Sequence, residues 1–83
     1  MATFTPGRLR QIMHVCAGPG EHPQLEGEFL DVPYTDLGFD SLAVLELATR
    51  IQQELGVPFP DATVAEMKTP RNVLDYVNQK MAA

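Results

Sequence analysis

The sequence has few of the residues that build metal centres and cross-linked domains. Its 83 residues include one cysteine, Cys16, and two histidines, His14 and His22, which stand apart from any cluster of further ligands. A single cysteine excludes an internal disulfide, and the histidine spacing matches no zinc site. We therefore expect no metal, and we interpret Cys16 as a small buried hydrophobe and not as a reactive thiol.

Basic residues and long apolar runs are also scarce. Six Lys and Arg against eleven Asp and Glu give a net charge of −5, which opposes binding to nucleic acid or to anionic lipid. No apolar run approaches the ~20 residues of a membrane span, and the amino terminus lacks the basic-then-apolar pattern of a signal peptide. We expect a cytoplasmic protein, without a nucleic-acid or membrane partner, whose protein partners present basic surfaces.

Alternating strand patterns of useful length are absent, whereas helical signals are clear. Thr5-Pro6 and Thr69-Pro70 each combine a helix cap with a proline at the first helical position. A helix over 41–55, ended by Gly56, and a short helix over 61–67 lie between these two starts. Apolar side chains repeat at helical spacing in the three long helices: Leu9, Ile12, Met13 and Cys16; Val44, Leu47, Ala48, Ile51 and Leu55; Val73, Leu74, Val77 and Met81.

These patterns predict an all-α fold in a single domain over residues 1–83: a small bundle of three amphipathic helices plus one short helix. Residues 18–40 lose the helical period and form a long loop between the first two helices. A loop of this length is usually functional or held by its own apolar residues. We expect a structured loop with one helical turn over 34–37, packed by Leu25, Phe29, Leu30, Val32, Tyr34 and Leu37.

Candidate catalytic residues are not arranged for catalysis. A serine nucleophile needs a base, yet His14 falls inside a predicted helix and His22 in a proline-flanked loop, neither at a meaningful spacing from a carboxylate. The G-x-S-x-G elbow of serine hydrolases is also missing. Asp36 and Asp40 are explained as helix caps and surface charges. We therefore predict no catalytic residue, and the small size favours a carrier or binding module.

Ser41 stands where the loop becomes the second long helix. Asp40 has the side chain expected of an N-cap, and Gly38 allows a tight turn before it. The first N–H groups of a helix have no intrahelical partner, and the positive end of the helix dipole lies behind them. A phosphate group attached to the Ser41 hydroxyl would therefore be stabilised.

The residues around Ser41 resemble a known motif. The attachment motif of acyl carrier proteins is similar to Leu37-Gly38-Phe39-Asp40-Ser41-Leu42 followed by Glu46-Leu47. Within that family, the carriers of bacterial type II (aromatic) polyketide synthases are the most similar. The similarity lies in the aromatic Phe39, in the sequence of residues 27–31 and in Thr69-Pro70-Arg71. The resemblance implies that a phosphopantetheinyl transferase attaches 4′-phosphopantetheine from coenzyme A to Ser41, and that the arm carries a growing polyketide chain as a thioester. A fatty-acid acyl carrier protein and an unmodified helical interaction module remain alternatives.

The same resemblance implies a set of partners: the phosphopantetheinyl transferase, the ketosynthase/chain-length factor, an acyltransferase, a ketoreductase and other polyketide tailoring enzymes. The helical wheel places Leu42 opposite the core stripe and Leu45 on its flank. We predict that these leucines dock partners together with Asp40 and Glu46, although Leu42 could instead cover the long loop. Candidates for an acyl pocket are Leu45, Ala48 and Val64. We expect a monomer.

Overall fold

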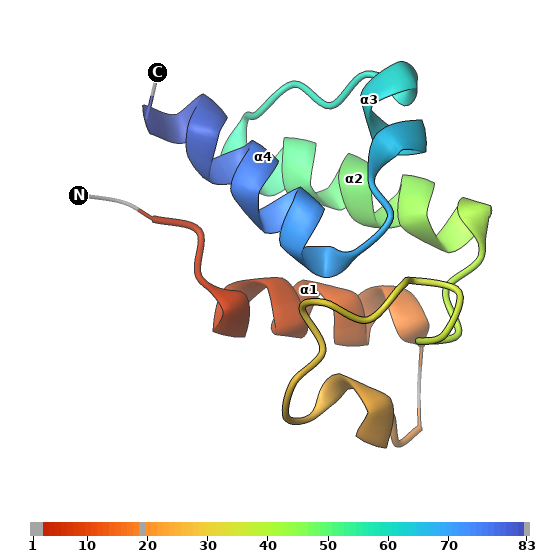
Figure 1. The fold of residues 1–83 in the computed structure, drawn as a ribbon. Helices are drawn as coiled ribbons and strands as arrows, with labels where there is room; N and C mark the ends of the chain where they lie inside the picture. Colours follow the sequence, from red (N-terminus) through yellow and green to blue (C-terminus); the bar gives the residue numbers. More distant parts are fainter. Residues whose placement is uncertain (1–2, 19, 83) are drawn as a thin grey trace.

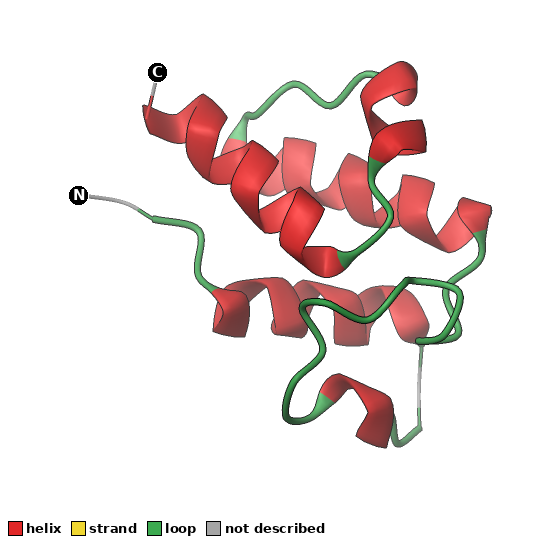
Figure 2. Cartoon of the chain, in the orientation of Figure 1, coloured by secondary structure: helices red, strands yellow, loops and turns green. Residues whose placement is uncertain are grey.

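The computed structural model describes residues 3–18 and 20–82. The elements are α1 (Pro6–Ala17), the 3₁₀ turn η1 (Pro23–Leu25), α2 (Ser41–Leu55), α3 (Asp61–Glu66) and α4 (Pro70–Ala82). Within the described residues there is no strand, and Figures 1 and 2 show helices joined by loops. The predicted fold class, an all-α bundle of three longer helices and one short helix, is confirmed.

The helices begin and end where local chemistry predicts. The Thr5 side chain accepts a hydrogen bond from the Arg8 N–H at 3.1 Å, with a proline at the first helical position of α1. Helix α2 begins after Asp40 and ends before Gly56, whose φ of 70° is left-handed and suits a residue without a Cβ. The predicted bounds of α2 are therefore those observed, because both its ends are set by adjacent residues.

One hydrophobic core joins the helices. Helix α2 packs against α1 and α3, and α1 also packs against α4, which lies in front of α2 in Figure 1. Cys16 is half-buried and packs against this core, less buried than expected because it lies in the last turn of α1. Buried side chains come from all four helices: Leu9, Ile12 and Met13; Leu47, Ala48 and Ile51; Val64; Val73, Leu74 and Val77.

The segment between α1 and α2 is packed along the helices. Its backbone is tied to the start of α4, since the Tyr34 N–H donates to the Lys68 carbonyl at 3.0 Å and the Arg71 N–H donates to the Leu30 carbonyl at 2.8 Å. The Arg71 guanidinium also pairs with Asp31 at 2.6 Å. The turn η1 was not predicted. Of the expected packing residues, four are buried, namely Leu25, Phe29, Tyr34 and Leu37, while Leu30 and Val32 are half-buried.

Candidate functional site

Ser41 is exposed at the first position of α2 and is the one serine of the sequence. The Asp40 carboxylate accepts a hydrogen bond from the Ala43 N–H at 2.8 Å, and its carbonyl accepts from Val44. The N–H groups of Ser41 and Leu42 precede these bonds and belong to the unpaired first turn of the helix. The hydroxyl therefore stands at a helix end suited to an anion.

The turn before Ser41 depends on a glycine and a buried aromatic ring. Gly38 has a φ of 84°, in the left-handed region that favours glycine. The next residue, Phe39, is buried, and its N–H donates to the Tyr34 carbonyl at 2.9 Å. This turn anchors the chain immediately before α2, so Ser41 is presented from a fixed position.

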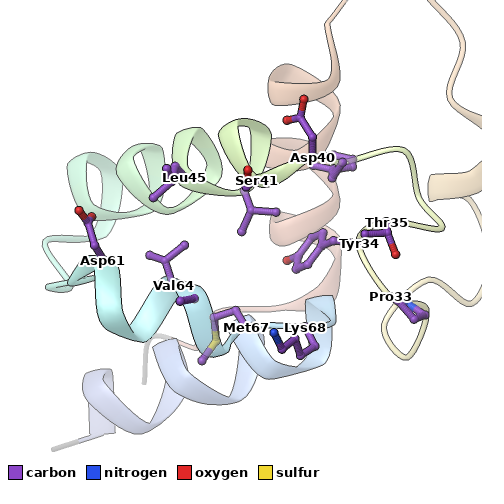
Figure 3. Close-up of a pocket in the computed structure, with 13 residues that line it drawn as sticks. Pro33, Tyr34, Thr35, Asp40, Ser41, Leu45, Asp61, Val64, Met67 and Lys68 are labelled. Atoms are coloured by element: carbon purple, nitrogen blue, oxygen red, sulfur yellow. The ribbon is translucent and has the colours of Figure 1, made fainter.

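A cavity of about 480 Å³ lies beside Ser41, between the 33–41 segment, α2 and α3. Figure 3 labels residues of its walls: Ser41 and Leu45 on α2 line the same space as Val64 on α3. The two predicted pocket residues Leu45 and Val64 thus line this cavity. Ala48 does not: it is buried one turn further along α2, where it lines a second, much smaller void with Leu47 and Val73.

Tyr34 lines the same cavity, and its hydroxyl is buried at the cavity wall. Its side chain is 3% exposed, and the hydroxyl oxygen has no hydrogen-bond partner among the described residues. Burial raises the pKa of Tyr34, so the phenol stays protonated and remains a donor. The sequence predicted Tyr34 only as an apolar packing residue, because nothing in the local pattern indicates where its hydroxyl points.

The predicted docking residues share the exposed side of α2 next to Ser41. Leu42 is 74% exposed and Leu45 is 37% exposed, and Asp40 and Glu46 are also exposed. Sequence reasoning missed Val15 of α1, a further apolar side chain that is 57% exposed.

Other candidate chemistry is sparse in the described part of the chain. His14 of α1 lies 3.8 Å from Glu26 and its ring is 5.9 Å from that of His22, yet no group of three or more His, Cys, Asp or Glu in residues 3–18 and 20–82 could hold a metal ion. Burial raises the pKa of the Cys16 thiol, which keeps it uncharged. No helix of this part is both long and apolar enough to cross a membrane.

A serine at a helix start beside an apolar cavity is the geometry of an attachment point, and sequence comparison agrees. Residues 21–77, more than half of the chain, match the family described as "Phosphopantetheine attachment site". The chain belongs to this family. Members are carriers of a covalent arm and not catalysts, so the phosphopantetheine group is the cofactor of this protein.

Relatives of this phosphopantetheine-binding carrier include acyl carrier proteins of polyketide synthases. The granaticin polyketide synthase acyl carrier protein of Streptomyces violaceoruber is 45% identical over 82 residues, covering 99% of this chain and 96% of the relative. The tetracenomycin polyketide synthase acyl carrier protein of Streptomyces glaucescens is 45% identical, covering 90% and 87%. The solved actinorhodin holo acyl carrier protein from S. coelicolor has a TM-score of 0.87 at 37% identity, covering 98% and 94%.

The residues of this carrier fit a phosphopantetheine arm. A phosphodiester on Ser41 would meet the free N–H groups of the first turn of α2 and the positive end of the helix dipole. The side of the cavity next to α2 and α3 is mostly apolar, and so suits an acyl chain; it includes Val44, Leu45, Val64, Ala65 and Met67. The arm supplies a thiol on which an acyl group is held as a thioester.

Proposed function

We propose that this carrier accepts 4′-phosphopantetheine on Ser41 and tethers a growing polyketide chain there as a thioester for delivery to synthase enzymes. The observation that carries the proposal is the position of the one serine: exposed at the start of α2 and on the rim of an apolar cavity of about 480 Å³. A carrier needs a reachable hydroxyl to load and a sheltered place for a reactive cargo. Both needs are met within one turn of α2.

Asp40 belongs to this site as a helix cap. A carboxylate next to a phosphodiester is electrostatically unfavourable, and the Asp40 carboxylate is already engaged by the Ala43 N–H at 2.8 Å. We therefore assign its charge to partner recognition and not to contact with the arm. Leu42, Leu45 and Glu46 complete the proposed docking surface, apolar at the centre and acidic at the rim.

The proposed partners are the phosphopantetheinyl transferase, the ketosynthase/chain-length factor, an acyltransferase, a ketoreductase and other tailoring enzymes. A net charge of −5 favours basic docking surfaces on these enzymes. Residues 1–83 would act as one monomeric carrier domain in the cytoplasm, where we expect coenzyme A to be available. A polyketide cargo is favoured over a fatty-acid cargo because relatives that align along 90% or more of the chain, those for granaticin and tetracenomycin, are named for polyketide synthases.

Loading by a phosphopantetheinyl transferase tests the proposal. The purified apo protein is incubated with coenzyme A, Mg²⁺ and the transferase, and its intact mass is measured. The wild type should gain the mass of one phosphopantetheine group, whereas Ser41→Ala should gain none. Thr49→Ala is the matched control, because it removes an exposed hydroxyl of the same helix that bonds only the Leu45 carbonyl, at 2.9 Å. A Ser41→Ala protein that still gains the arm would contradict the proposal, and an unmodified wild type would favour a plain interaction module.

A further inference from the structure

The Tyr34 hydroxyl is a buried donor that the carrier fold itself does not use. The side chain is 3% exposed, and no described residue accepts its hydrogen or donates to its oxygen. Leaving such a group without a partner is unfavourable, because it has lost its hydrogen bonds to water and gained none in return. A buried polar group without a protein partner needs an explanation, and beside a binding cavity a bound ligand can supply that partner.

The position of the Tyr34 ring is fixed by its surroundings. The Tyr34 N–H donates to the Lys68 carbonyl at 3.0 Å, and the Tyr34 carbonyl accepts from Leu37 at 3.0 Å and from Phe39 at 2.9 Å. The ring packs against that of Phe39, with centroids 5.7 Å apart. The hydroxyl therefore has little freedom to turn towards another partner.

The hydroxyl is aimed at the space where a cargo chain would lie. In Figure 3 it points from the loop side towards the walls formed by Val64 and Met67, across the cavity that opens beside Ser41. Both facing side chains are apolar. Met67 is half-buried and unbranched, so it can repack easily around an entering chain and uncover the hydroxyl.

We propose that the Tyr34 hydroxyl is a specificity-determining donor that gives the cavity a preference for a chain bearing a keto oxygen over a saturated chain of the same length. The inference rests on the proposed function, in which Ser41 carries the chain. A ketone buried among apolar side chains loses its hydrogen bonds to water, and the Tyr34 hydroxyl replaces one of them. A saturated chain gains nothing from Tyr34 and leaves the hydroxyl unpaired.

The experiment compares two cargoes of equal length. Apo protein is loaded by the transferase from coenzyme A analogues whose pantetheine arm carries a non-hydrolysable 3,5-dioxohexyl or hexanoyl chain, or from coenzyme A itself for the bare arm, and each product is verified by intact mass. The sequence has two tyrosines, so labelling tyrosine with ¹³C at Cζ gives two signals that report hydrogen bonding at each phenol. Contacts between the chain and the methyl groups of Leu45 and Val64 report entry into the cavity.

In the wild type the Tyr34 signal should shift with the dioxohexyl chain and stay in place with the hexanoyl chain or the bare arm. Tyr34→Phe should weaken the contacts of the dioxohexyl chain with Val64 about 2- to 10-fold, the worth of one hydrogen bond, and change those of the hexanoyl chain less. Tyr76→Phe makes the same chemical change outside the cavity, where the Tyr76 hydroxyl donates to the Pro58 carbonyl at 2.6 Å, and should leave both cargoes as in the wild type.

Three results would overturn the inference alone: a Tyr34 signal that ignores the keto groups, an equal shift with the bare arm, or an equal effect of Tyr34→Phe on both cargoes. The first two are read in the wild type, so they do not depend on whether the variant folds. A protein that gains no mass overturns the proposed function and the inference with it. Intact mass separates that case from a loaded carrier whose tyrosine does not respond.

Discussion

At the scale of single residues, Asp40 has two separable properties, a hydrogen bond and a charge. Its carboxylate accepts from the Ala43 N–H at 2.8 Å at the start of α2. Asp40→Ala removes the cap and should lower the free energy of unfolding by about 1 kcal/mol, measured by urea denaturation. Asp40→Asn keeps a capping oxygen and should stay close to the wild type.

The same two variants distinguish capping from partner recognition, because both remove the negative charge beside Ser41. If the transferase binds the carrier partly through that charge, both variants should be loaded more slowly and to a similar degree, whatever their stability. Slow loading of Asp40→Ala with normal loading of Asp40→Asn would mean that the cap matters and the charge does not. Rates are compared at a temperature where both proteins remain folded.

The two tyrosines make a matched pair for stability in the apo protein. Tyr34→Phe removes a buried hydroxyl without a partner among the described residues, so the free energy of unfolding should stay the same or rise by up to about 1 kcal/mol. Tyr76→Phe removes a hydroxyl that donates to the Pro58 carbonyl at 2.6 Å, so it should lower the free energy by about 1 kcal/mol. A clear loss in Tyr34→Phe, seen in thermal or urea unfolding, would mean that its hydroxyl already has a partner in the apo protein.

At the scale of elements, α2 has one face for the core and another for partners. Leu47 is 1% exposed, so Leu47→Ala should cost about 2–5 kcal/mol of unfolding free energy. Leu42 is 74% exposed, so Leu42→Ala should change stability by less than about 0.5 kcal/mol and yet slow acyl transfer to partner enzymes. Loss of stability in Leu42→Ala with normal transfer would assign Leu42 to loop packing instead of docking.

The elements also show what a sequence can and cannot predict. The bounds of α2 follow from Asp40 and Gly56, since capping is decided by neighbours along the chain. Buried residues in irregular segments do not recur at a regular spacing, so the sequence pattern did not indicate them. Phe39, Val57 and Phe59 are such residues, and all three belong to the core. The position of Ser41 was predictable because the Asp40 cap sets the start of α2, whereas the burial of Phe39, Val57 and Phe59 was not predictable.

The cavity beside Ser41 was predictable only in part. Leu45 and Val64 were expected to line it and do, whereas Ala48 falls outside it because the cavity lies nearer the start of α2. The role of Tyr34 is missing from any sequence pattern, since the direction of its hydroxyl depends on how the loop packs against α3 and the start of α4. A cavity formed by three segments that are apart in the sequence can be described only once the tertiary structure is known.

At the scale of the whole molecule, hydrogen bonds between distant residues close the bundle. The Phe4 N–H donates to the Asn78 side-chain oxygen at 2.8 Å, and the Asn78 amide donates to the Phe4 carbonyl at 2.9 Å, which joins positions 74 residues apart. Phe4 itself is 2% exposed. This pair fixes the segment before α1 against α4. In Figure 1 the start of α1 and the end of α4 lie on the side of the molecule away from the start of α2.

Asn78→Ala therefore tests whether the scaffold and the attachment site are independent. It leaves the backbone N–H and carbonyl of buried Phe4 without their Asn78 partners, and should lower the free energy of unfolding by about 1–3 kcal/mol in urea. Gln79→Ala, which truncates an exposed amide next to it on α4, is the control and should change stability by less than about 0.5 kcal/mol. Loading of Ser41 should be normal in both variants below their melting temperatures, because the loop, α2 and α3 that form the site are held by other contacts. Slow loading in a folded Asn78→Ala protein would show that closure of the bundle also sets the geometry at Ser41.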